Sequence, residues 1–169
     1  MEEYLKEFLL GLNTFNKRQY QEAIFHFERS LQIANSIGLN SPEEIFACYF
    51  NIGNAKRKLK KFPEAVSAYQ NALKYNSQNE DVYLNITDCC FEIETVDSLE
   101  LAVKLLSFCE RNFPTNKILI ANLGVGCLKL GIAYIETGKI DLAKKLFLNA
   151  KRLGSEKADE LLDFVKDFE

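Results

Sequence analysis

The sequence predicts an all-α protein built from repeated pairs of helices. Only three prolines and eight glycines interrupt its 169 residues, which leaves too few turns for a many-stranded β fold. Alanine returns four times in the same local setting, and glycine precedes it at a constant distance in three of the four cases. Apolar residues make up 47% of the chain, enough for one unit that buries roughly 70% of the surface of its unfolded form.

The repeated alanines are Ala23, Ala65, Ala102 and Ala143. Four residues after them stand, in order, Phe27, Tyr69, Leu106 and Phe147. Twelve residues before three of the alanines stand Gly11, Gly53 and Gly131, while the third unit has Thr87 at a distance of 15. Glycine and alanine let neighbouring helices approach closely, and the large side chain fills the remaining space. Since glycine inside a helix costs ~1 kcal/mol relative to alanine, its recurrence indicates a packing role.

These residues resemble the tetratricopeptide-repeat family. Its signature joins an aromatic-x2-Leu-Gly helix to an Ala-x3-aromatic helix. The clearest match is Tyr49-Phe50-Asn51-Ile52-Gly53, followed by Phe62-Pro63-Glu64-Ala65 and Tyr69, and the third unit diverges most. The resemblance implies an α-α superhelix, a tetratricopeptide-type solenoid of antiparallel helix pairs. It also implies that the first helix of each pair lines a concave, peptide-holding face.

The pattern predicts four repeats within residues 1–154, followed by a C-terminal capping helix. The repeats cover about 1–38, 42–77, 79–114 and 117–154, and the cap covers 155–169. The predicted helices lie near 2–16, 20–37, 42–59, 63–76, 79–93, 98–112, 117–136, 139–153 and 155–168. The second helix is lengthened and is expected to end at Gly38. Ser41 and Glu44 are predicted to form a capping box around Pro42, and Gly124 and Gly126 to kink or break a lengthened helix.

The resemblance implies a binding groove for a protein or peptide segment. Its predicted residues are Leu5, Phe8, Leu12, Phe15, Phe50, Asn51, Asn54, Arg57, Lys58, Leu84, Asn85, Asp88, Phe91, Leu128, Lys129, Ile132 and Ile135. The groove is largely apolar, and contiguous apolar surface of this kind usually has a binding role. The amides of Asn51, Asn54 and Asn85 would hold the ligand main chain. The expected ligand is an apolar or amphipathic segment of a partner.

Two alternatives remain open for the same residues. A structural homo-oligomer, in the simplest case a homodimer, would bury the apolar face between copies. Several of the apolar residues would otherwise close the superhelix itself, Phe15 and Ile135 first among them. A further hypothesis is that the chain is an enzyme or a small-molecule sensor. That function would require a deep polar pocket.

Catalysis, metals and cofactors are not expected. His26 is the only histidine, and neither a GxSxG nor a GxxxxGK[ST] motif occurs, so the common nucleophile and phosphate-binding arrangements are missing. The net charge of −3 argues against a nucleic-acid partner. The basic run at residues 56–61 falls at a predicted helix end, where cations are favoured.

The chain is expected to work in the cytoplasm without membrane insertion. Its start is acidic rather than basic, unlike a secretory signal, and no run is expected to reach the ~18 apolar residues of a membrane span. The five cysteines are odd in number and lack CxxC spacing, which is typical of free buried thiols. The sequence therefore predicts a non-catalytic adaptor, scaffold or chaperone-like module.

Overall fold

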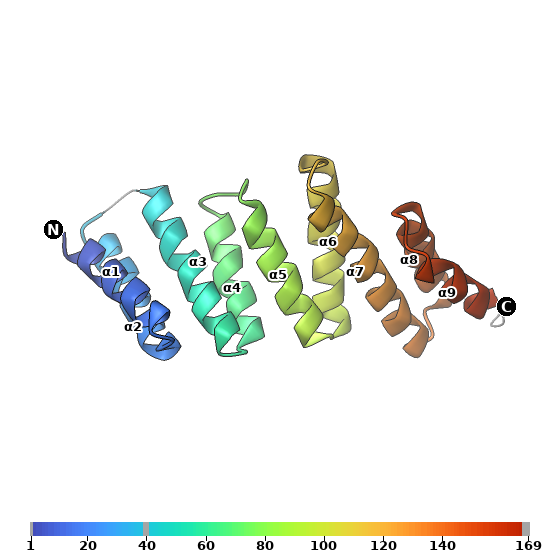
Figure 1. Cartoon of the computed structure of the whole chain (residues 1–169), viewed down its shortest axis with the longest axis horizontal. Coiled ribbons are helices and arrows are strands. Elements are labelled where there is room, and N and C mark those ends of the chain that lie inside the picture. The colour runs from blue at the N-terminus through green and yellow to red at the C-terminus, as the bar shows by residue number, and fades with distance from the viewer. Residues whose placement is uncertain (1, 39–40, 167–169) are drawn as a thin grey trace. The chain divides into compact units, whose positions relative to one another are not determined.

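The computed structural model describes residues 2–38 and 41–166, and within these ranges all regular secondary structure is helical (Figure 1). The helices are α1 (Glu3–Asn16), α2 (Tyr20–Ser36), α3 (Pro42–Lys58), α4 (Phe62–Leu73), α5 (Glu80–Ile93), α6 (Val96–Asn112), α7 (Lys117–Glu136), α8 (Ile140–Arg152) and α9 (Lys157–Lys166). Their bounds lie within three residues of the predicted ones. Phe168, predicted to lie on the last helix, is outside the described residues.

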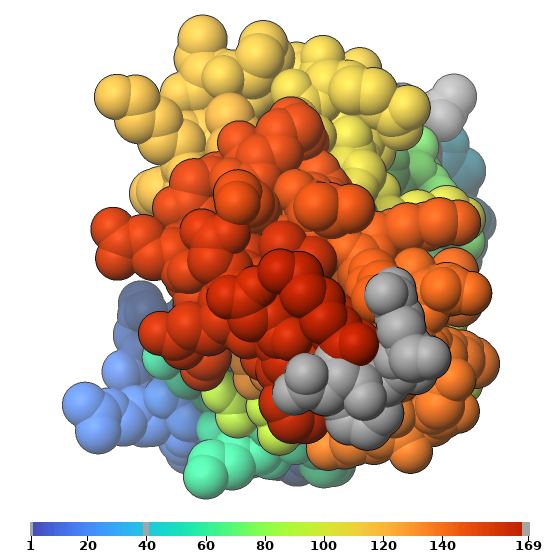
Figure 2. All heavy atoms as spheres, turned by 90° about the vertical axis from the view of Figure 1, so that its right-hand side faces the viewer, coloured from blue at the N-terminus to red at the C-terminus, as the bar shows by residue number. Residues whose placement is uncertain are grey.

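The described residues form two compact units, Met1–Cys89 and Cys90–Glu169, with the boundary inside α5. In the first unit α1 packs against α2, α2 against α3, and α3 against α4. In the second unit α7 packs against α6 and α8, and α8 packs against α9 (Figure 2). Half-buried Leu161 and Leu162 of α9 join a cluster that contains Phe147 and Val165. The division into four repeats and a cap stays a prediction.

The predicted close approach of helices at the repeated glycines is confirmed in three hairpins, where the aromatic ring of the paired helix lies directly against the glycine. A Cβ added at Gly11 would lie 2.6 Å from the ring of Phe27. At Gly53 it would lie 2.5 Å from Tyr69, and at Gly131 it would lie 2.3 Å from Phe147. All three rings are fully buried. Only a residue without a side chain therefore lets the ring rest directly on the backbone of the facing helix.

The turns that follow the first helices share a backbone feature. Arg18, Lys60 and Glu94 have φ between 58° and 63°, and Gly138 has φ 73°. They come one or two residues after α1, α3, α5 and α7 end. A residue in the left-handed conformation ends a helix and turns the chain back. The same turn geometry therefore joins first and second helices although only one of the four residues is glycine.

The predicted break at Gly124 and Gly126 is wrong, because α7 is one uninterrupted helix from Lys117 to Glu136. A Cβ added at Gly126 would lie 3.3 Å from Cγ2 of Val103 and 3.5 Å from the ring of Phe91. Gly126 therefore makes room for neighbouring side chains. Packing on both sides of α7 stabilises a helix whose glycines alone would weaken it.

The expectation that no segment resembles a membrane span also needs correction. By length and composition α7 is apolar enough to cross a bilayer, with a mean hydropathy of 1.9. It packs against both α6 and α8, and its buried residues include Leu119, Leu123, Cys127 and Leu130. A helix with neighbours on two sides needs apolar residues on more than one face, which accounts for part of this composition; 39% of the apolar stretch is buried.

The predicted capping box at the start of α3 is wrong in its side-chain contacts. Ser41 is the N-cap residue and Pro42 opens the helix, but the Ser41 side chain makes no capping hydrogen bond. The Glu44 carboxylate instead accepts a 2.7 Å hydrogen bond from the Tyr4 hydroxyl of α1. Glu44, the residue predicted to complete the capping box, therefore links α3 to α1 through this hydrogen bond.

Candidate protein-binding surfaces

All seventeen predicted groove residues are either exposed or half-buried, and none lies fully inside the core. In the first unit they lie on α1, α3 and the first part of α5, which run in the same direction (Figure 1). In the second unit they lie on the end of α5 and on α7. Their binding role stays a prediction.

An apolar cavity of about 170 Å³ opens in the first unit. Tyr4, Leu5 and Phe8 of α1 line it together with Ser30, Glu43, Glu44, Ala47 and Cys48. An apolar cavity of ~150 Å³ is large enough for one benzene ring. The cavity therefore fits one aliphatic or phenyl side chain of a ligand, and it is too small for a drug-sized molecule.

Leu9 belongs to the same surface, although the sequence reasoning did not include it. Its side chain is 45% exposed, and that of Leu5, one turn earlier on α1, is 36% exposed. The signal was present, because residues four apart share a helix face. The position was missed because the corresponding residues of α3 and α5 are the polar Asn51 and Asn85.

Several predicted groove residues also pack against the core. In the first unit Phe8, Leu12 and Phe15 contact the cluster around Phe27 and Ile52. In the second unit Leu128 and Ile135 contact the cluster of Phe147 and Val165. These side chains help to hold the helices together, as one of the alternatives from the sequence required, and a ligand would meet only their exposed part.

The polar centre of the first unit is largely engaged in internal bonds. Asn51 donates to the carbonyl of Ala47 at 2.8 Å, and the Tyr69 hydroxyl donates to Asn54 Oδ1 at 2.8 Å. Burial raises the pKa of Tyr69 well above its usual value, so this hydroxyl stays a donor. The amide oxygen of Asn54 thus accepts the hydrogen bond that the buried Tyr69 hydroxyl needs. It is therefore less available to accept a hydrogen bond from a ligand.

Arg57 is the exception in this polar centre. Its Nη1 lies 3.5 Å from Asp88 Oδ2, while its Nε is buried and has no hydrogen-bond partner among the described residues. A buried donor without an acceptor is uncommon in folded proteins.

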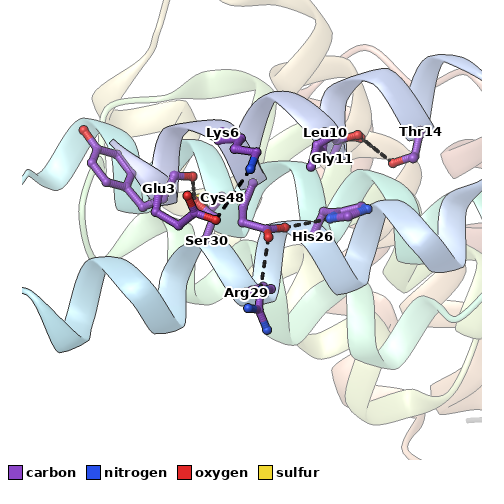
Figure 3. Close-up of polar contacts among 11 residues, drawn as sticks. Glu3, Lys6, Leu10, Gly11, Thr14, His26, Arg29, Ser30 and Cys48 are labelled. Carbon is purple, nitrogen blue, oxygen red and sulfur yellow. Dashed lines mark hydrogen bonds and ion pairs between the residues drawn. The ribbon is translucent and has the colours of Figure 1, made fainter. Parts of the chain in front are cut away.

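The only histidine has a structural partner. Glu7 of α1 is 8% exposed, and its carboxylate lies 2.7 Å from His26 Nδ1 and 3.1 Å from Arg29 Nε, both on α2 (Figure 3). Two partners compensate the charge of a nearly buried carboxylate. His26 therefore helps to join the two helices of the first hairpin.

The surface of α7 in the second unit carries both charge and apolar side chains. Lys129 pairs with Glu94, and the Tyr134 hydroxyl donates to Glu100 at 2.5 Å, which raises its pKa to about 12. The exposed fractions are 62% for Ile118, 44% for Val125 and 37% for Ile132. The described part of the chain contains no group of three His, Cys, Asp or Glu residues placed to hold a metal.

The five cysteines, all free and buried, provide a test of the packing. Desolvation raises the pKa of Cys48 and of Cys90 to about 11. Because the thiolate is the reactive form, we expect the native protein to react far more slowly with a thiol reagent at pH 8 than the unfolded chain. Absorbance after addition of Ellman's reagent measures this. Rapid reaction of several thiols without denaturant would contradict the buried arrangement.

The structure defines a class of protein: an all-α helical repeat protein. The TPR repeat family model matches residues 53–87. Together with the glycine–aromatic contacts, this match supports the resemblance to the tetratricopeptide-repeat family. Proteins built on this scaffold are in general protein-interaction modules.

Known proteins with similar sequence or fold agree with this assignment. Protein KINESIN LIGHT CHAIN-RELATED 2 of Arabidopsis thaliana is 27% identical over 167 residues, which cover 90% of this chain and 24% of that protein. The chain thus spans about a quarter of that relative. A TPR repeats protein from Bacteroides fragilis has a TM-score of 0.68 at 17% identity, covering 98% of this chain and 69% of the other. MamA from Desulfovibrio magneticus has a TM-score of 0.56 at 17% identity, with 98% and 85% covered. At these identities the structures show the fold alone.

Proposed function

We propose that this chain is a non-catalytic adaptor or scaffold that holds an apolar or amphipathic segment of another protein. The proposed site is the face of the first unit formed by α1, α3 and the first part of α5. The observation that supports it best is the apolar cavity of about 170 Å³ lined by Leu5 and Phe8. One turn after the cavity-lining Leu5 on α1 stands Leu9, which is 45% exposed. A ligand side chain that fills this cavity would act as the anchor of the segment.

The surroundings of the cavity support a segment rather than a small molecule. Asn85 and Arg57 lie farther along the same set of helices, and both are only partly buried. The guanidinium group of Arg57, whose side chain is 34% exposed, would donate to a main-chain carbonyl or a carboxylate of the ligand. An anchor in a pocket combined with main-chain contacts nearby is a common way to bind peptides.

Two finer features of the role belong to the same proposal. A chaperone-like function follows if the bound segment would otherwise expose apolar surface to water. A cytoplasmic site of action agrees with five free thiols, since oxidising compartments favour disulfides.

The test is to select binders from a random peptide library displayed on phage and to measure their affinity by fluorescence anisotropy. We expect apolar-rich peptides that bind the wild-type chain, and an affinity at least ~10-fold lower for Leu9→Asp, because a charge one turn after the cavity-lining Leu5 opposes an apolar ligand segment. Phe25→Asp is the matched control, since Phe25 is 57% exposed on α2 and lies outside the site. Equal losses for both variants would exclude this face.

A further inference from the structure

The side chains along α7 follow a pattern that its role within the second unit does not require. Ile118, Val125 and Ile132 recur every seven residues, and Ala121, Leu128 and Ile135 follow each of them after three. This is the a/d spacing of a coiled coil, with β-branched residues at every a position. These six residues form the α7 seam.

The seam is open to solvent along most of its length. Its three a residues are 62%, 44% and 37% exposed in chain order, and Ala121 is exposed as well. Leu128 and Ile135 are half-buried at one edge, where the cluster of Phe147 and Val165 holds them in place. At twenty residues, α7 is about 30 Å long. An exposed apolar stripe of this length on a rigid helix is typical of a helix-binding surface.

The charges at the two ends of the helix indicate which helix would bind. Lys117 stands just before the seam and Glu136 just after it, and both are exposed. If two copies of α7 lie antiparallel, Lys117 of one faces Glu136 of the other at both ends. In the same register Ile118 faces Ile135, Ala121 faces Ile132, and Val125 faces Leu128 of the second copy. Every a residue then meets a d residue, as an antiparallel pair requires.

We propose that the α7 seam binds the same seam of a second copy of this chain, forming a symmetric antiparallel dimer. The pairing is isologous, because the same residues contribute from both sides. A single pair of helices buries little area compared with obligate dimers, so the dimer forms reversibly and depends on concentration. This inference is independent of the proposed peptide site, which lies on the first unit.

Sedimentation equilibrium over a wide concentration range tests the dimer. The wild-type chain is expected to change from monomer to dimer, whereas Val125→Glu stays monomeric at every concentration. The control is Leu148→Glu, since Leu148 is 57% exposed on α8 and lies outside the seam. Wild-type chain that remains monomeric throughout, or equal behaviour of the two variants, overturns the proposal. Far-UV circular dichroism checks that both variants fold.

Charge reversal tests the antiparallel register. Lys117→Glu alone and Glu136→Lys alone each place like charges at both ends, and each is expected to weaken the dimer about tenfold. Neither change opposes the helix dipole, since each puts the favoured charge at its helix end. A mixture of the two variants restores opposite charges at both ends, and so does the double variant. If neither the mixture nor the double variant recovers wild-type association, the register is wrong.

The two sites are tested independently. Val125→Glu is expected to bind library-selected peptides as tightly as the wild type, and Leu9→Asp is expected to dimerise as the wild type does. A variant that loses dimerisation but still binds peptide thus tests only the proposed α7 dimer. A variant that loses peptide binding but still dimerises tests only the proposed peptide site on the first unit.

Discussion

Replacing Gly131 by alanine is expected to lower the free energy of unfolding by about 3 kcal/mol, at the upper end of overpacking effects. The new methyl group would lie 2.3 Å from the ring of Phe147, which is fully buried, so the ring or the two helices would have to shift. Helix propensity alone predicts the opposite, a gain of ~1 kcal/mol for Gly→Ala inside a helix. Urea denaturation decides between the two, and here the steric effect should dominate.

The same helix supplies the matched control for this experiment. At Gly124 an added Cβ would have Leu153 Cβ as its nearest neighbour, at 3.8 Å, which is an ordinary contact distance. Gly124→Ala is therefore expected to stabilise the protein by up to ~1 kcal/mol. If both alanine variants changed stability in the same direction, the direct ring-on-glycine contact would not explain why glycine recurs in the repeat.

A second substitution tests the mechanism of the Gly131 effect. The third unit has a residue with a side chain, Thr87, at the glycine position, and Leu106 at the aromatic position, and both are fully buried. We therefore expect Phe147→Leu to recover part of the loss caused by Gly131→Ala, with a coupling of ~1–2 kcal/mol in a double-mutant cycle. Strictly additive effects would mean that the two residues do not compete for the same space.

Asn54→Leu is the second substitution with a large expected effect, and it acts on stability as well as on binding. It removes the acceptor of the 2.8 Å hydrogen bond from Tyr69, whose side chain is fully buried. A buried hydroxyl left without a partner costs ~1–3 kcal/mol. Denaturant titration should show this loss in the absence of any ligand.

The control for Asn54→Leu is the same change in a Tyr69→Phe background, where no hydroxyl remains to be satisfied. There the cost is expected to fall below ~1 kcal/mol. An equally large loss in both backgrounds would show that Asn54 acts through other contacts. Phe50 carries a similar complication, since its ring lies 6.0 Å from that of Tyr69. Leu9 and Val125 are therefore better positions for probing binding than Phe50 or Asn54.

The family relationship also places limits on the role of this chain. The relative in Arabidopsis thaliana is about four times as long as the stretch that matches, and the structural neighbours share only the fold at 17% identity. The identity of a partner therefore has to come from the surfaces themselves. Of these, the apolar cavity on α1 and the seam on α7 offer the most specific chemistry.

The sequence alone determined the helices and the positions where they approach each other. Both are local or periodic properties: apolar spacing predicts a helix, and Gly11, Gly53 and Gly131 recur at matching positions because a ring must rest on each. The same periodicity contains the α7 seam, but only exposure distinguishes it from core packing.

Only the tertiary structure decided what each surface side chain contacts. Glu44 bonds to Tyr4, forty residues away, instead of closing a capping box, and Asn54 serves Tyr69 on another helix. Gly124 and Gly126 leave α7 unbroken because its neighbours pack against it. A polar side chain forms its hydrogen bond with whichever group the packed helices place next to it. The residues adjacent to it in the sequence do not specify that group.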